Sequence, residues 1–109
     1  MLSLDECRSK FGEVWTQERE GVVFVFRWPE PDAFDEALGL AVNAEKGGDY
    51  RNGLKAFEII TKASCCSHTP AELDAIRRTA PPSGYMLFSD LGAPLLMRFR
   101  REAPEQGKD

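Results

Sequence analysis

The chain has 109 residues, with 14 Lys and Arg against 18 Asp and Glu and a net charge of −4. This length builds one domain with its own core, and the acidic balance argues against a nucleic-acid-binding protein, which usually carries a basic face. No apolar run approaches the ~20 residues of a membrane span, and acidic residues stand where a signal peptide is basic, so we expect a cytoplasmic protein without membrane contact.

The first residues carry the signals of a short helix over residues 3–11. Ser3 can cap the amide of Glu6, and the Glu6 carboxylate can reach back to the amide of Ser3, which makes a capping box. Gly12 suits the end of this helix because glycine readily takes a left-handed conformation. The sequence therefore predicts an N-terminal helix before the first strand.

Residues 14–18 and 22–27 are rich in β-branched and aromatic side chains, as strands are. The intervening E-R-E-G is typical of a type I turn with Gly21 in the left-handed position. We therefore predict a β-hairpin over residues 13–28. Its second strand has apolar residues on both faces as far as Phe26.

Pro29 and Pro31 end the strand and favour the first turn of a helix over about residues 31–45. A second helix over residues 50–66 has apolar side chains on more than one stripe, which predicts that it is the central and most buried helix. These side chains are Leu54, Phe57, Ile59, Ile60, Ala63 and Cys66.

A further helix start follows in the sequence T-P-A-E. Thr69 can cap the helix, Pro70 suits its first turn, and Glu72 completes a second capping box. The sequence therefore predicts a helix over residues 70–79 that begins directly after a short connection.

Two adjacent cysteines, Cys65 and Cys66, and the only histidine, His68, precede this helix. We place both cysteines in the last turn of the preceding helix and the histidine in the connection. A structural zinc ion needs four ligands, usually in paired spacings, and three cysteines are an odd number that gives no disulfide framework. We therefore assign no metal, no cofactor and no catalytic residue. A thiol or hydrolytic enzyme built around Cys66 and His68 is the alternative interpretation.

The last segment predicts a helix over residues 84–101, followed by a flexible tail over residues 102–109. Pro94 removes one backbone hydrogen bond inside this helix, so we expect either a kink near Gly92 or a second helix that Asp90 caps. If the helix is continuous, one of its faces is apolar and points to the core. The residues of this face are Phe88, Leu91, Leu95 and Phe99.

The opposite face of the same helix is apolar as well. At ~100° per residue, Met86 and Met97 lie nearly opposite the core face, with Leu87 and Leu96 on its flanks. Methionine is flexible and polarisable, so such a face suits the binding of several different apolar helices. We predict that these four residues, together with Trp28 at the sheet-to-helix junction, bind a partner.

Together these patterns predict an α+β fold that is mostly helical, with residues 1–101 as a single domain: a short helix, one hairpin and four further helices. This order resembles the small tail assembly chaperones of tailed bacteriophages, prophages and gene transfer agents. In that family a Phe-Arg-x-Pro junction, an aromatic early in the next helix and a late Pro-x-Glu-Leu recur in this order. Here they correspond to Phe26, Arg27, Pro29, Phe34, Pro70, Glu72 and Leu73.

The resemblance implies a protein of the bacterial host cytoplasm that performs no catalysis. Such chaperones keep the long helical tape-measure protein soluble while tail-tube subunits polymerise around it. The partners implied are therefore the tape-measure protein and the tail-tube protein, and a second copy of the chain is a further candidate. The alternative binding function is a secretion-type chaperone or another small adaptor, although those chaperones usually need more strands than one hairpin for their dimer sheet.

Overall fold

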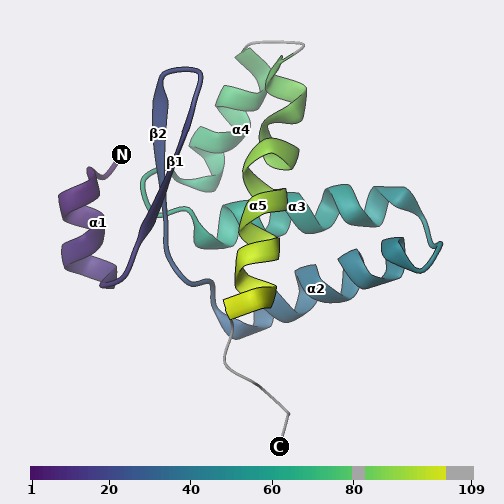
Figure 1. The fold of residues 1–109 in the computed structure, drawn as a ribbon. Coiled ribbons are helices and arrows are strands. Elements are labelled where there is room, and N and C mark those ends of the chain that lie inside the picture. The colour runs from purple at the N-terminus through teal and green to yellow at the C-terminus, as the bar shows by residue number, and fades with distance from the viewer. Residues whose placement is uncertain (80–82, 103–109) are drawn as a thin grey trace, which may run out of the picture.

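Helices make up most of the part of the chain that the structure describes, residues 1–79 and 83–102 of a computed structural model (Figure 1). A short helix and an antiparallel hairpin come first, and only helices follow, which confirms the predicted fold class. No helix among these residues is long and apolar enough to cross a membrane. The elements are α1 (Leu4–Phe11), β1 (Trp15–Arg19), β2 (Val22–Phe26), α2 (Pro31–Glu45), α3 (Tyr50–Ser64), α4 (Pro70–Thr79), the 3-10 helix η1 (Ser83–Met86) and α5 (Leu87–Glu102).

Both predicted capping boxes are confirmed. The backbone amide of Ser3 donates to Oε1 of Glu6 at 2.8 Å, and the amide of Glu6 donates to Oγ of Ser3 at 3.1 Å. Thr69 and Glu72 repeat this arrangement with the same two distances at the start of α4. Gly12 follows α1 with a φ of 82°, as expected for the residue that ends it. These local signals fix where α1 and α4 begin.

The hairpin turn differs from the predicted type I turn. Arg19 pairs with Val22, so the loop consists of Glu20 and Gly21 alone, and both have positive φ angles of 53° and 81°. Two positive φ angles are what a type I′ turn requires, and its twist matches the right-handed twist of the two strands. The first strand therefore ends at Arg19, one residue later than predicted, and the loop is shorter than the four residues E-R-E-G.

The two adjacent cysteines lie in an extended segment, and their predicted place in the last turn of a helix is wrong. Helix α3 ends at Ser64, and Cys65 lies opposite Phe26 as an isolated bridge beside β2. The amide of Cys66 donates to the carbonyl of Val25 at 2.9 Å. Because β2 offers these backbone groups on its outer edge, the chain leaves the helix two residues early to pair with it.

Helix α5 continues without a break through Pro94, which lies inside it and is exposed. The expected second helix start at Asp90 is wrong, because Asp90 lies in the first turn of α5 and bonds Nε of Arg19 at 3.0 Å. The predicted end of this helix at residue 101 is one residue early, since Glu102 is the last residue of α5. Residues 103–109, like residues 80–82, lie outside the described residues.

The most buried helix is α5, and the prediction that the helix over residues 50–66 would hold this place is wrong. Helix α5 lies between α3 and the hairpin, where the side-chain amide of Gln17 donates to the carbonyl of Leu91 at 3.4 Å. Seven residues of α5 are buried, against four of α3. The predicted core face of α5 is confirmed, because all its members are buried: Phe88, Leu91, Leu95 and Phe99.

Helix α5 crosses α3 (Figure 1), and Gly92 of α5 lies directly against the backbone of Phe57 in α3. A Cβ atom at this position would lie 2.6 Å from the carbonyl oxygen of Phe57 and 2.8 Å from its Cα. Real Cβ atoms do not approach backbone this closely, so only glycine permits the observed separation of the two helices. Helix α2 also packs along α3, and open space remains where the three helices meet.

Candidate partner-binding grooves

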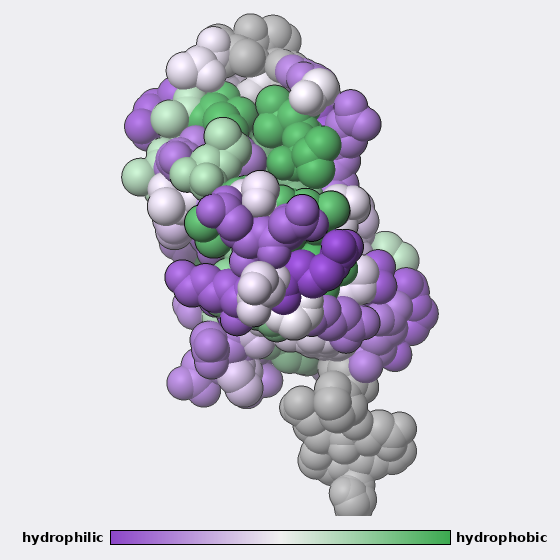
Figure 2. Space-filling view, turned by 90° about the vertical axis from the view of Figure 1, so that its left-hand side faces the viewer, coloured by the Kyte–Doolittle hydropathy of each residue, from purple (hydrophilic) through white to green (hydrophobic). Residues whose placement is uncertain are grey.

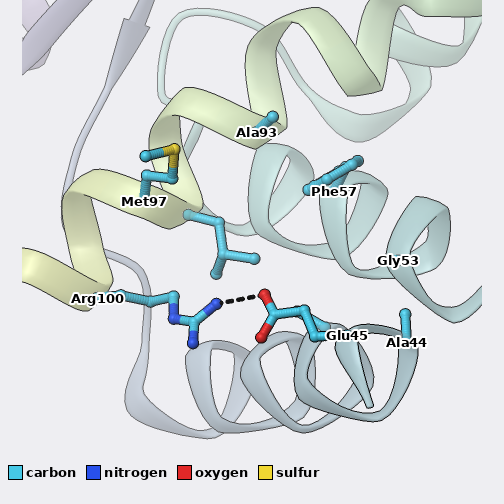
Figure 3. A pocket seen from close by; sticks show the side chains of 9 residues that line it. Ala44, Glu45, Gly53, Phe57, Ala93, Met97 and Arg100 are labelled. Carbon is cyan, nitrogen blue, oxygen red and sulfur yellow. Dashed lines mark hydrogen bonds and ion pairs between the residues drawn. The ribbon is translucent and has the colours of Figure 1, made fainter. Parts of the chain in front are cut away.

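An apolar groove lies where α2, α3 and α5 meet (Figure 3). Its volume is about 330 Å³. We call it the lower groove because α2 and the C-terminal half of α5, which line it, lie below the crossing of α3 and α5 in Figure 1. It is lined by Ala41, Ala44, Glu45, Gly53, Phe57, Ala93, Leu96, Met97 and Arg100.

Small side chains keep the lower groove open. Ala44 of α2, Gly53 of α3 and Ala93 of α5 face one another across it, and larger residues at these positions would fill the space. Leu96 is buried, whereas Met97 is 63% exposed. The surface offered to a partner is therefore mainly aliphatic, with a flexible thioether beside it.

One ion pair crosses the lower groove near the end of α5 (Figure 3). The guanidinium of Arg100 donates to Oε2 of Glu45 at 2.8 Å. Both side chains are solvent-accessible, so the pair stabilises the fold by only about 0–1 kcal/mol. A partner could therefore replace this ion pair with contacts of its own, and the free energy of unfolding would change little.

A second groove, the upper groove, lies on the other side of the crossing. Its volume is about 260 Å³, and it combines apolar and basic side chains. Leu54 and Tyr85, which is 67% exposed, supply apolar surface. The complete lining is Arg51, Leu54, Lys55, Glu58, Arg77, Tyr85, Phe88 and Ser89.

The predicted partner-binding residues of α5 fall into three groups. Met97 is exposed and lines the lower groove, and Leu96 lines the same groove from a buried position. Met86 of η1 is 52% exposed, next to Tyr85 of the upper groove. Leu87 is completely buried, so its placement on an accessible flank is wrong. Its side chain packs in the core because the helix is covered on that flank as well.

Trp28 lies in an aromatic cluster at the sheet-to-helix junction. Its ring centroid is 5.4 Å from that of Trp15 and 5.0 Å from that of Phe99. Such distances are typical of stabilising aromatic pairs. Trp28 is half-buried and packs the junction against α5. It is not among the residues that line either groove.

The side of the molecule that carries α1 looks different (Figure 2). It is hydrophilic across its middle, and apolar side chains gather above, over the hairpin and α4. Val22 and Val23 are exposed at the end of the hairpin. Neither residue lines either groove, so this area is a separate surface.

The thiols lie together where α1 meets the connection between α3 and α4. Cys7 of α1 is completely buried, and the thiol of Cys66, which is half-buried, donates to the carbonyl of Val25 at 3.4 Å. Burial is the main cause that raises the pKa of Cys66 to about 12, and it also raises the pKa of Cys65. At neutral pH the thiols of Cys65 and Cys66 are protonated, which is the unreactive form.

The ring of His68 forms its hydrogen bond with Ser67 and not with a thiol. Its Nδ1 lies 2.7 Å from Oγ of Ser67, and this oxygen also accepts a hydrogen bond from the amide of Val25 at 3.0 Å. The pKa of His68 is lowered, chiefly by burial, which favours the neutral ring. Within residues 1–79 and 83–102 no group of three or more His, Cys, Asp or Glu side chains is placed to hold a metal ion.

We expect all three thiols to react slowly with a disulfide reagent in the folded chain. Because burial covers all three thiols and keeps those of Cys65 and Cys66 protonated, the rate at pH 8 should be more than about tenfold below that of free cysteine. The measurement is the absorbance of released thiolate, with the urea-unfolded chain as the control, in which all three should react quickly. Rapid modification of Cys66 in the folded chain would contradict this.

Sequence reasoning missed several groove residues, among them Ala44, Gly53 and Tyr85. These residues carry no motif, and they become neighbours only because α2, α3, η1 and α5 pack together. Comparison with family models, with curated proteins and with solved structures finds no match for this chain. Its function is therefore inferred from its residues and from the geometry of the two grooves.

Proposed function

We propose that the protein is a tail assembly chaperone of a tailed bacteriophage or prophage and performs no catalysis. In this function it binds helical segments of the tape-measure protein in the host cytoplasm while tail-tube subunits assemble. The resemblance of the ordered motifs suggests this class of protein. The observation that carries the proposal is the lower groove.

The lower groove supports helix binding through its shape and its lining. Three helices enclose an apolar channel, and amphipathic helices commonly bind in such grooves through side chains at helical spacing. Met97 is 63% exposed on its rim, and a flexible methionine adapts to different apolar side chains along one long partner. A chaperone for a long, repetitive helical protein needs this tolerance.

The thiol alternative receives less support from the geometry. A nucleophilic cysteine needs a depressed pKa and a neighbouring base, whereas burial raises the pKa of Cys66 to about 12. The candidate base, His68, bonds to Ser67 instead. A secretion-type chaperone or other adaptor would use the same groove and differs only in the partner that it retains.

The test is co-purification of the tape-measure protein from the same genome with wild-type chain and with Met97→Lys. A lysine at this exposed position should leave the free energy of unfolding within about 0.5 kcal/mol of wild type. It should lower the amount of retained tape-measure protein at least tenfold, because a charge would be placed against an apolar helix.

The matched control is Val23→Lys, which changes an apolar residue on the hairpin that is 51% exposed and lies outside both grooves. This variant should retain the tape-measure protein as wild type does. Equal retention by Met97→Lys would contradict the proposed site, and no retention by the wild-type chain would contradict the proposed function.

A further inference from the structure

The two grooves lie on the same side of α5. Helix α5 crosses α3 at Gly92, with the lower groove on one side of the crossing and the upper groove on the other. Both lie toward the N-terminal end of α3, where α3 extends beyond α5 (Figure 1). Helix α3 lines both grooves, with Gly53 in the lower and Leu54 in the upper. A helix bound alongside α5 would therefore pass from one groove to the other over α3.

At Gly53 such a bound helix can approach the backbone of α3 closely. Gly53 lies in α3 and has no side chain, and a Cβ atom built there would meet only Cβ of Ala44, at 3.5 Å. That is an ordinary van der Waals contact, so the fold itself does not require glycine at this position. The absence of a side chain leaves the backbone of α3 open to close approach by another chain.

The spacing of the grooves defines the length of the occupant. Ser89 lines the upper groove and Arg100 the lower, eleven residues apart on α5. At ~1.5 Å per residue this separation is about 17 Å, or three turns. An α-helix of about 12 residues therefore spans both grooves from end to end.

The charges around the upper groove favour an acidic occupant. Three basic side chains line it against one carboxylate, Glu58, although the whole chain carries a net charge of −4. One of the three pairs with Asp49 at 2.7 Å, and the local charge stays positive. Opposite charge at the rim of an interface steers and orients the partner. These basic side chains are Arg51, which is the one paired with Asp49, Lys55 and Arg77.

We propose that a single amphipathic helix of the partner lies alongside α5, crosses α3 at Gly53 and fills both grooves, with carboxylates at the end of its apolar stripe that enters the upper groove. This rests on the proposed function, and it adds the length, the path and the charge pattern of the bound segment. The apolar stripe contacts Leu54, Tyr85 and Met97, and the carboxylates meet the basic side chains of the upper groove.

The first experiment uses synthetic helical peptides labelled with a fluorophore and the full chain. One peptide of about 18 residues carries a Leu and Ala stripe with four Glu residues at one end, and its control carries Lys at those four positions. Binding followed by fluorescence anisotropy should be at least tenfold tighter for the Glu peptide, and 0.5 M NaCl should reduce the difference. A Glu peptide of two turns should bind at least tenfold more weakly than the long one.

The second experiment tests the crossing point with Gly53→Gln. Glutamine favours the helix and adds bulk where the partner would cross, so the long Glu peptide should bind at least tenfold more weakly to a chain that melts as wild type does. The matched control is Gly39→Gln on the exposed side of α2, where nothing lies within 4 Å of a Cβ atom. This control should bind the peptide unchanged.

Equal affinity for the Glu and Lys peptides, or an unchanged affinity of Gly53→Gln, would overturn the inference. If the tape-measure protein is still retained through Met97 in that case, the proposed function stands and only the path and the charge pattern are wrong. Conversely, selective binding of the Glu peptide without retention of any tape-measure protein would support the site and contradict the proposed function. A dimer that Met97→Lys dissociates, with no peptide bound, would assign the grooves to a second copy and also overturn the inference.

Discussion

Replacing Gly92 by alanine is expected to destabilise the fold although alanine favours helices. The added Cβ atom would lie 2.6 Å from the carbonyl oxygen of Phe57, so α5 and α3 must move apart. Overpacking of this kind typically costs about 1–3 kcal/mol, and we expect Gly92→Ala to lower the free energy of unfolding by about 2 kcal/mol. Because the two helices also enclose the grooves, their separation should weaken partner binding as well.

The measurement for Gly92→Ala is urea unfolding followed by tryptophan fluorescence. Trp15 and Trp28 both contact Phe99 of α5, so they report the packing of the hairpin against this helix. The control is Gly39→Ala in α2, where a Cβ atom meets nothing within 4 Å. Helix propensity alone should then raise the free energy of unfolding by about 0.5–1 kcal/mol. If both variants gain stability, the close crossing at Gly92 is not what holds the two helices.

The second large effect is expected for Ser67→Ala. The hydroxyl of Ser67 is buried, accepts from the amide of Val25 at 3.0 Å and lies 2.7 Å from Nδ1 of His68. Its removal leaves two buried polar groups without this partner, at about 1–3 kcal/mol for each unsatisfied group. We expect the free energy of unfolding to fall by about 2–4 kcal/mol, with a loss of amide protection at Val25 in hydrogen exchange.

The matched control for Ser67→Ala is Ser9→Ala, which makes the same chemical change at an exposed position inside α1. Its effect should stay within about 0.5 kcal/mol of zero, or stabilise slightly through helix propensity. Near-equal stability of Ser67→Ala and wild type would mean that Val25 and His68 find other partners. The connection between α3 and α4 would then be less firmly anchored to β2 than these distances indicate.

Much of the fold could be predicted from local signals. Ser3 with Glu6 and Thr69 with Glu72 determine two helix starts, because a capping box uses only atoms within four residues of one another. Gly12 ends α1 for an equally local reason. The core face of α5 followed from helical spacing, because four large apolar side chains on one stripe cannot all face water.

Tertiary structure decided the features that depend on elements far apart in the sequence. The chain leaves α3 at Ser64 because β2 offers backbone partners to Cys65 and Cys66, and no signal near these residues announces that edge. Leu87 is buried on what spacing marked as a flank, since the cover of a helix depends on its neighbours and not on its own sequence.

The candidate site shows the same division. Helical spacing alone predicted that α5 carries more apolar surface than one core face can use, and it singled out Met97, which is exposed on the rim of the lower groove. Only the tertiary structure placed Ala44 and Gly53 across from Met97, because a groove is the space left between helices that small residues allow to approach. Volume between elements has no local signature, so the site emerges only once α2, α3 and α5 are packed together.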